Sequence, residues 1–229
     1  MSEKYVTIKL NGASVKVKEK TSVLNAAMEY GVCIPNLCNV QGLEAIGSCR
    51  LCIVELINNG KSKVISSCTL EAREGMYILT HSPKIIKARK NIAEMLVAEA
   101  PNSKAVQDVA ARCGVNKVRY NFRNADCIQC GRCVRVCKEM WQSRSLGFVG
   151  RGDKRHVALP FDRRPETCKR CWTCVDMCLM TIPPCPGPIE NGKEYLCNRC
   201  ASQVSMAANT ADTCVWCELG KGFDCVRYN

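Results

Sequence analysis

The chain has 229 residues, 20 of them cysteines, and a formal net charge of +12. Residues 1–30 hold no apolar segment typical of a secretory signal, and no run of about 18 apolar residues predicts a membrane span. Because the cysteines cluster in Cys-x-x-Cys motifs, they indicate metal ligands in a reducing cytoplasm rather than the disulfides of a secreted protein.

The positive charge raises the question of nucleic-acid binding. Thiolates bound to iron are negative, and a cluster held by four of them carries about −2 when oxidised. Three such clusters lower the net charge to about +6, and a fourth site with four cysteines lowers it to about +4. We therefore interpret the excess of lysine and arginine as compensation for buried clusters, and we expect no nucleic-acid partner.

The first elements are predicted from turn and capping signals. Residues 5–17 alternate apolar and polar around Asn11-Gly12, which predicts a hairpin with a type I′ turn. A short helix is expected next, capped by Thr21 or Ser22 and ended by a glycine. A cysteine-rich loop and a second hairpin, with an Asn-Asn-Gly turn, follow. This order of elements predicts a β-grasp fold.

Four cysteines of this region form the pattern Cys38-x10-Cys49-x2-Cys52-x15-Cys68. Three of them lie in or beside one loop, and the fourth comes from a distant strand end. This is how a loop encloses a [2Fe–2S] cluster, whose sulfurs can accept hydrogen bonds from backbone N–H groups. Structural zinc usually shows two compact Cys-x-x-Cys pairs instead. The spacing therefore predicts a [2Fe–2S] site.

The stretch IPNLCNVQGLEAIGSCRLCIVEL resembles the N-terminal ferredoxin domain of the large iron–sulfur subunit of respiratory complex I. It is equally similar to the corresponding domain of NAD-linked and electron-bifurcating hydrogenases. The resemblance implies a plant-type [2Fe–2S] ferredoxin-like domain over residues 1–80, with the same four cysteines as ligands. Cys33 lies outside the pattern and is expected to be a small buried hydrophobic residue.

A helical linker is predicted over residues 81–120. Apolar residues at helical spacing fill 83–100, and Pro101 ends the helix. In the resembling family, a His and three cysteines in this region bind a further [4Fe–4S] cluster. Here the stretch has no His and only Cys113, so that cluster is expected to be absent. Cys113 is interpreted as a packing residue at the end of a short helix.

The strongest motif is a repeat within a domain predicted over residues 121–185. CIQCGRCVRVC and CKRCWTCVDMC share one spacing, typical of bacterial ferredoxins, where the fourth cysteine of each motif ligates the other [4Fe–4S] cluster. One predicted ligand set is Cys127, Cys130, Cys133 and Cys178. The other predicted set is Cys168, Cys171, Cys174 and Cys137. Trp141 and Trp172 stand beside these motifs; they could shield the clusters from water, but ordinary packing is the favoured interpretation.

A cysteine-rich metal-binding tail is predicted over residues 186–229. Its two pairs give Cys197-x2-Cys200-x13-Cys214-x2-Cys217, a spacing that fits a four-cysteine zinc ribbon. Tetrahedral thiolates suit zinc or a fourth [4Fe–4S] cluster, and both remain open. Cys185 and Cys225 could substitute as ligands. The fold class is thus α+β, with a β-grasp [2Fe–2S] domain, a helical linker, a two-[4Fe–4S] domain and this tail.

The sequence contains no nucleotide-binding GxGxxG or GxxxxGK[ST] motif and no recognisable Ser/His/Asp set. We therefore expect a non-catalytic subunit that relays single electrons between clusters. The resemblance implies a flavin/NAD(P)-binding subunit and a catalytic subunit as partners, a hydrogenase first. A formate dehydrogenase or a tungsten aldehyde oxidoreductase is the alternative catalytic partner.

Two other classes of function are weighed against this one. A free polyferredoxin would carry electrons by diffusion, but free carriers tend to be small and acidic, whereas this chain is basic and built of several modules. A redox regulator is the other alternative, and no DNA-binding element is visible in the sequence.

Overall fold

The computed structural model describes residues 4–123, 125 and 127–180. Contacts between residues divide the chain into two units, one ending at Cys130 and the other beginning at Gly131. The boundaries predicted at residues 80, 120 and 185 remain predictions.

The first unit opens with a hairpin of β1 (Tyr5–Leu10) and β2 (Ala13–Lys18). The two strands pair antiparallel across Asn11 and Gly12, and both turn residues have positive φ, as a type I′ turn requires. Helix α1 (Val23–Glu29) follows, and the Ser22 side chain caps it by accepting a hydrogen bond from the Asn25 N–H. The predicted hairpin and the predicted cap are confirmed.

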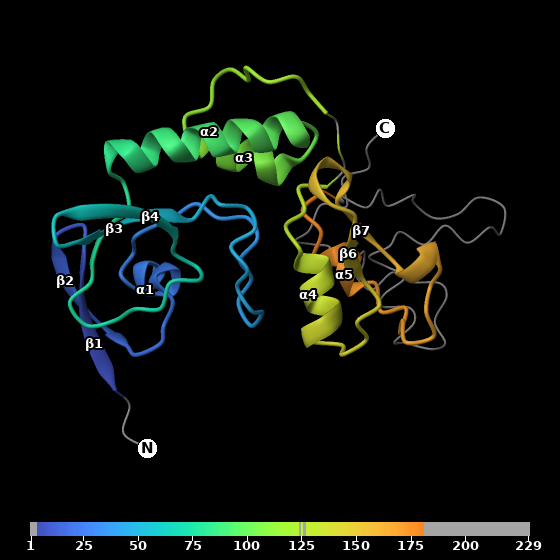
Figure 1. The fold of residues 1–229 in the computed structure, drawn as a ribbon, viewed down its shortest axis with the longest axis horizontal. Coiled ribbons are helices and arrows are strands. Elements are labelled where there is room, and N and C mark those ends of the chain that lie inside the picture. Colours follow the sequence, from blue (N-terminus) through green and yellow to red (C-terminus); the bar gives the residue numbers. More distant parts are fainter. Residues whose placement is uncertain (1–3, 124, 126, 181–229) are drawn as a thin grey trace, which may run out of the picture. The chain divides into compact units, whose positions relative to one another are not determined.

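The sheet has five strands and is mixed. A second hairpin, β3 (Ile53–Asn58) and β4 (Lys61–Ser66), is joined to the first by β5 (Tyr77–Leu79), and the strand order is β2-β1-β5-β3-β4. Strand β5 is parallel to β1 and antiparallel to β3. The sequence predicted the two hairpins and not this central strand. Helix α1 packs with the sheet in one core, which includes Ile8, Val54 and Ile78 (Figure 1).

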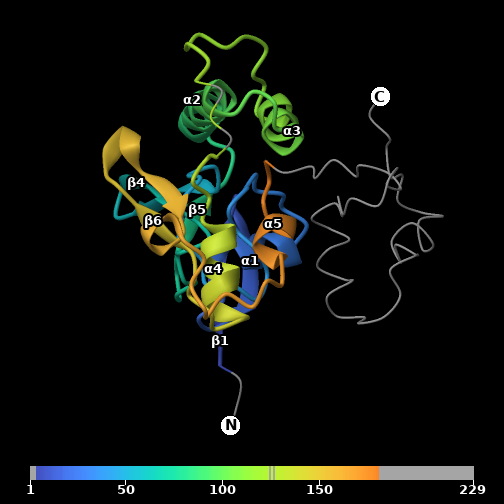
Figure 2. The same ribbon diagram turned by 90° about the vertical axis from the view of Figure 1, so that its right-hand side faces the viewer.

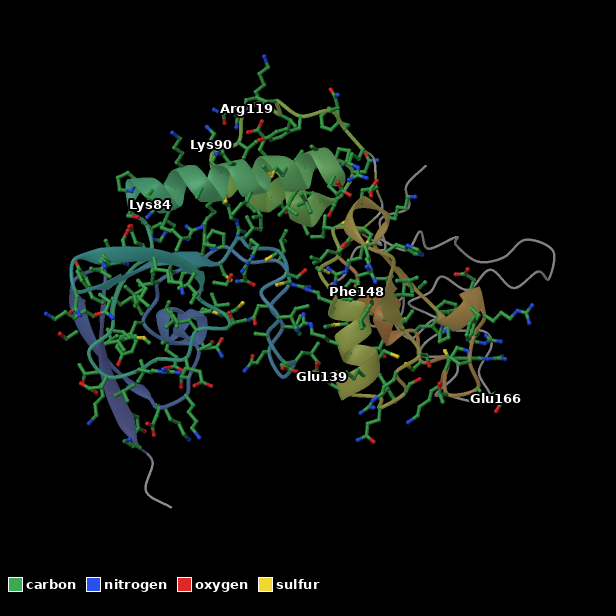
Figure 3. All side chains as sticks on the ribbon, in the orientation of Figure 1. Lys84, Lys90, Arg119, Glu139, Phe148 and Glu166 are labelled. Atoms are coloured by element: carbon green, nitrogen blue, oxygen red, sulfur yellow. The ribbon has the colours of Figure 1, made fainter. Side chains whose placement is uncertain are left out.

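Two helices complete the first unit. Helix α2 (Pro83–Glu99) is capped by Ser82, and α3 (Lys104–Arg112) ends at Cys113. The helix predicted over 83–100 and the position of Cys113 at a helix end are confirmed. Figures 1 and 2 show α2 and α3 side by side, and contacts between their residues agree. Lys84 and Lys90 lie on the exposed side of α2 (Figure 3).

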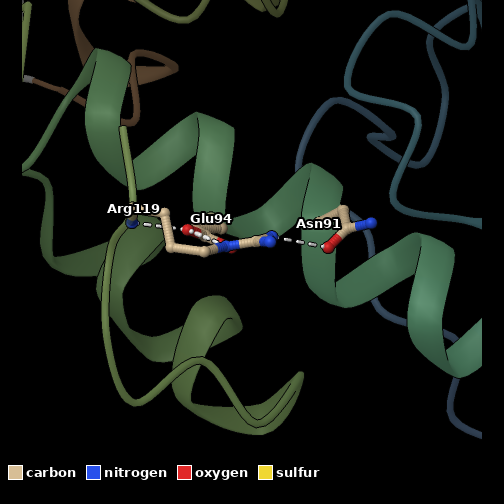
Figure 4. A network of polar contacts seen from close by, with 3 residues as sticks. All are labelled: Asn91, Glu94 and Arg119. Carbon is tan, nitrogen blue, oxygen red and sulfur yellow. Dashed lines mark hydrogen bonds and ion pairs between the residues drawn. The ribbon is translucent and has the colours of Figure 1, made fainter. Parts of the chain in front are cut away.

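The segment after α3 is fastened to α2 by one polar network (Figure 4). The buried carboxylate of Glu94 accepts hydrogen bonds from the backbone N–H and the guanidinium of Arg119, at 2.5–3.0 Å. Arg119 also donates to the Asn91 side chain at 2.9 Å. Further along, the backbone N–H of Arg123 donates to the Ala98 carbonyl. The chain therefore returns along the end of α2 before it reaches the first CxxC motif.

The second unit contains short elements around its cysteines. Helix α4 (Arg132–Glu139) packs against α5 (Thr173–Asp176). Between these helices in the sequence come the antiparallel strands β6 (Gly147–Val149) and β7 (His156–Ala158). A 3₁₀ turn at Gly152–Lys154 and a tight turn at Pro160–Asp162 accompany them. In the described part of the chain, no helix is long and apolar enough to cross a membrane.

Candidate iron–sulfur centres

The four cysteines predicted to hold a [2Fe–2S] cluster all lie inside the first unit. Cys38 and Cys49 are in the long loop between α1 and β3, Cys52 immediately precedes β3, and Cys68 follows β4. Each is at most 4% exposed. A loop that buries its thiols keeps water away from whatever they bind, which is a condition for tuning an iron–sulfur centre.

These thiols are arranged in two pairs. A hydrogen bond from the Cys38 thiol lowers the pKa of Cys49 to about 5, and the same contact, with burial, raises the pKa of Cys38. In the second pair, the Cys68 thiol lowers the pKa of Cys52 to about 6 while its own pKa rises. In each pair, the pKa of one thiol is therefore lowered, which favours the thiolate form that binds iron.

Backbone N–H groups converge on the Cys49 sulfur. The amides of Leu37 and Cys38 each donate to it at 3.5 Å. Such donors stabilise negative charge on a ligand sulfur and tune the centre that it binds.

The paired arrangement suits a binuclear cluster. A [2Fe–2S] cluster needs four cysteine thiolates for two irons, so that each iron takes two from the protein. The donor set and its burial therefore fit a [2Fe–2S] cluster.

A second set of cysteines shares one cavity, within the second unit. A cavity of about 260 Å³ is lined by Cys137, Cys168, Cys171 and Cys174, the four residues predicted to hold one [4Fe–4S] cluster. Burial, and then the neighbouring Cys171 and Cys137, raise the pKa of the Cys174 thiol. Four thiols around a common space fit the donor set of a [4Fe–4S] cluster.

Other groups of the second unit complete this cavity. The backbone N–H of Ser145 donates to the Cys137 sulfur at 3.3 Å. Trp141 and Trp172 line the cavity, and the Trp141 indole donates to the Thr173 hydroxyl at 2.9 Å. Both tryptophans therefore line the space of the proposed cluster, and whether they shield it or only pack stays a prediction.

The two CxxCxxC motifs have the same backbone conformation. Gln129 and Arg170, at equivalent positions, have φ near +53° and +52°. Gly131 and Trp172, one residue past the second cysteine, are also left-handed, with φ of 69° and 58°. Helices α4 and α5 begin directly after them. A left-handed conformation costs a non-glycine residue about 1–2 kcal/mol, so Trp172 occupies a position that favours glycine.

The other predicted set of four is distributed over both units. Cys127 and Cys130 belong to the first unit, whereas Cys133 and Cys178 belong to the second. Within the first unit, the Gln129 N–H donates to the Cys127 sulfur at 3.3 Å. The assignment of these four cysteines to one cluster remains a prediction.

The remaining cysteines complete the comparison with the sequence. Cys33 was predicted to be buried and is exposed, because its neighbour Ile34 occupies the core instead. Cys113 is half-buried at the end of α3. The predicted tail ligands lie outside the described residues; they are Cys197, Cys200, Cys214 and Cys217, with Cys185 and Cys225 as substitutes.

Comparison with known proteins finds a family match for the N-terminal part of the first unit. Residues 3–83 match the family described as a 2Fe-2S iron-sulfur cluster binding domain. This part of the chain is therefore similar to that family, and the five-stranded sheet with its buried cysteine loop lies within the matched residues.

Over about three quarters of its length, the chain is similar to subunits of NADH- and NADPH-linked oxidoreductases. It is 29% identical to a subunit of the NADH-quinone oxidoreductase of Rhizobium meliloti, over 78% of this chain and 24% of the relative. It is 26% identical to the alpha subunit of the NADPH-Fe(3+) oxidoreductase of Geobacter sulfurreducens, over 76% of this chain and 23% of the relative. The chain thus spans about a quarter of the length of these curated relatives.

A solved structure gives the same indication. A chain of an NAD+-reducing [NiFe]-hydrogenase in the H2-reduced state has a TM-score of 0.60 and 28% identity, with 67% of this chain and 74% of that chain covered. The resemblance to complex I and hydrogenase iron–sulfur subunits, inferred from the cysteine motifs, is confirmed by these homologues.

Proposed function

We propose that this chain is the iron–sulfur subunit that relays single electrons between a flavin/NAD(P)-binding subunit and a catalytic subunit, a hydrogenase first. The observation that carries the proposal is the buried double pair of cysteines within a 2Fe–2S domain. The relatives named above support a role as one subunit of a larger assembly, in preference to a free carrier.

The proposed ligands follow the two-pair geometry. Cys38 and Cys49 are assigned to one iron of the [2Fe–2S] cluster, and Cys52 and Cys68 to the other. The two [4Fe–4S] clusters are assigned to the two sets already given, and the tail set to zinc or a fourth cluster. Iron–sulfur clusters, when bound, take up and release one electron at a time.

The residues around the first site prepare it for that role. Burial of the four thiols excludes water, and the N–H groups of Leu37 and Cys38 stabilise negative charge on the Cys49 sulfur. The Ser48 hydroxyl, next to Cys49, donates to the Gln129 carbonyl at 2.7 Å, inside the CIQC motif. This hydrogen bond links the loop of the proposed [2Fe–2S] site to a loop of a proposed [4Fe–4S] site.

The proposal is tested by purifying the full chain from its own cells under anaerobic conditions. We expect it to elute from a size-exclusion column as a complex that contains flavin. We also expect NADH or NADPH to bleach the iron–sulfur absorbance of that complex. The same sample without pyridine nucleotide is the reference. Elution of the chain alone as a monomer would contradict the subunit role.

A further inference from the structure

Arg89, on helix α2, is a charged residue buried beside the [2Fe–2S] domain's cysteine loop. Only 4% of it is exposed. Its Nε donates to the Leu51 carbonyl at 3.0 Å, and one terminal nitrogen donates to the Ile53 carbonyl at 2.8 Å. Since Leu51 and Ile53 are the neighbours of Cys52, the guanidinium holds the backbone on both sides of a proposed ligand.

The same terminal nitrogen also donates to the carbonyl of Thr80 at 3.1 Å. Arg89 therefore joins three segments that are distant in the sequence: the cysteine loop, the end of β5 and helix α2. The planar fork of an arginine suits several carbonyls at once, whereas lysine offers a single nitrogen.

No carboxylate pairs with Arg89 in the part of the chain that the structure describes. Glu55, on β3, is bonded to Ser82 and lies 3.6 Å from Lys84, and Glu94, on the same helix, is bonded to Arg119. A guanidinium keeps its charge when buried, and a buried charge is costly unless an opposite charge compensates it. Burial lowers the pKa of Arg89, and the thiols of Cys113, Cys52 and Cys33 oppose this effect.

We propose that Arg89 is a positioning residue for the [2Fe–2S] site, and that its charge raises the cluster's reduction potential. The inference rests on the proposed cluster. An oxidised [2Fe–2S] centre with four thiolates carries about −2, and it gains one more negative charge when it takes up an electron. A fixed positive charge stabilises the more negative state, so reduction becomes more favourable. The buried charge of Arg89 is therefore balanced by the negative charge of the cluster, since no carboxylate of the described residues balances it.

The experiment compares Arg89→Gln, Arg89→Lys and Lys90→Gln in the full chain. The glutamine keeps an N–H donor at the chain length of Nε but carries no charge, and the lysine keeps the charge. Lys90→Gln removes the same charge one residue away, on the exposed side of α2 (Figure 3). The midpoint potential of the [2Fe–2S] cluster is measured by dithionite titration followed by EPR, together with iron content and melting temperature.

We expect Arg89→Gln to shift the midpoint potential to a more negative value. Arg89→Lys is expected to stay close to wild type in potential but to melt at a lower temperature, since it loses hydrogen bonds. Lys90→Gln is expected to change neither the midpoint potential nor the melting temperature. An unchanged potential in Arg89→Gln, or an equal shift in Lys90→Gln, overturns the inference.

Failure to load the cluster is also decisive. If Arg89→Gln holds no cluster but Arg89→Lys holds one at a near wild-type potential, the charge is required and the inference stands. If neither variant loads, Arg89 is only a structural residue and the electrostatic role is overturned. If the wild-type chain holds no [2Fe–2S] cluster, the proposed function fails instead.

Discussion

The side-chain hydroxyl of Ser48 donates a hydrogen bond to the backbone carbonyl of Gln129 across 2.7 Å, although 81 residues separate them. Ser48 directly precedes Cys49, and Gln129 lies between Cys127 and Cys130. The backbone of Gln129 is left-handed. Two cysteine motifs that are assigned to different clusters are thus in contact through one hydrogen bond.

Replacing Ser48 by alanine removes this contact. We expect a loss of about 1 kcal/mol in the free energy of unfolding, the usual worth of one such hydrogen bond. We also expect slower electron exchange between the [2Fe–2S] cluster and the cluster at Cys127 and Cys130, because the connecting path is broken. Rapid freeze-quench EPR after partial reduction measures that rate. Ser14→Ala, which removes an exposed hydroxyl on β2, is the matched control, and equal rates in the two variants would contradict the prediction.

The ligand assignment predicts different results for two neighbouring cysteines. Cys49→Ser is expected to lose the [2Fe–2S] signal and about two irons per chain, because one sulfur of a buried pair is removed. Cys33→Ser is expected to keep both, since Cys33 is exposed and outside the pairs. Iron analysis and EPR of the two purified variants give the answer. Loss of the signal in Cys33→Ser would require a different ligand set.

Local features of the fold could be predicted from the sequence, and long-range ones could not. Asn11-Gly12 and Ser22 determine a turn and a cap through their own backbone and side-chain chemistry. Strand β5 has only three residues, and its pairing with β1 and β3 depends on segments far away in the chain. A strand this short carries too little alternation to be recognised.

In the candidate site, too, local features could be predicted from the sequence and long-range contacts could not. Cysteine spacing predicted the ligand sets, because a cluster restricts how far apart its ligands stand in the sequence. Arg89 lies within the stretch KIIKARK, where it looks like one more exposed helical cation. In the structure it is 4% exposed, and its guanidinium donates to the carbonyls of Leu51 and Ile53. Likewise, Cys33 was wrongly predicted to be buried, since one residue's shift in an irregular loop exchanges core and surface.

Trp172 is predicted to protect the cluster assigned to Cys137, Cys168, Cys171 and Cys174. It lines their cavity despite a left-handed backbone. Trp172→Gly relieves that strain but opens the wall, so we expect faster loss of the [4Fe–4S] absorbance in air. Phe161→Gly is the control, because Phe161 is also left-handed but is 96% exposed and does not line this cavity. Equal bleaching rates in these two variants would argue against a protective role.

The Glu94–Arg119 network predicts a pH dependence of stability. Hydrogen bonds from Arg119 hold the pKa of Glu94 below its ordinary value of 4.5. A carboxylate with a depressed pKa stabilises the fold fully above its ordinary pKa and loses this contribution as the pH falls below it. Glu94→Gln is therefore expected to lower the melting temperature at pH 7.

The difference in melting temperature between wild type and Glu94→Gln should stay constant down to about pH 5 and shrink below about pH 4.5. Circular dichroism of the helices follows unfolding at each pH. Asp108→Asn, which breaks the exposed pair with Lys104 on α3, is expected to change little at any pH. A difference that grows at acidic pH would contradict the sign of the prediction.

Iron and acid-labile sulfide analysis, combined with low-temperature EPR of the fully loaded chain, tests the electron-relay account most directly. The account predicts at least about ten irons per chain, from one [2Fe–2S] and two [4Fe–4S] clusters. Parallel zinc analysis assigns the tail site to zinc or to a fourth cluster. Three distinct signals that disappear separately in Cys49→Ser, Cys130→Ser and Cys171→Ser would agree with the account. Fewer than about ten irons in a fully loaded sample would contradict it.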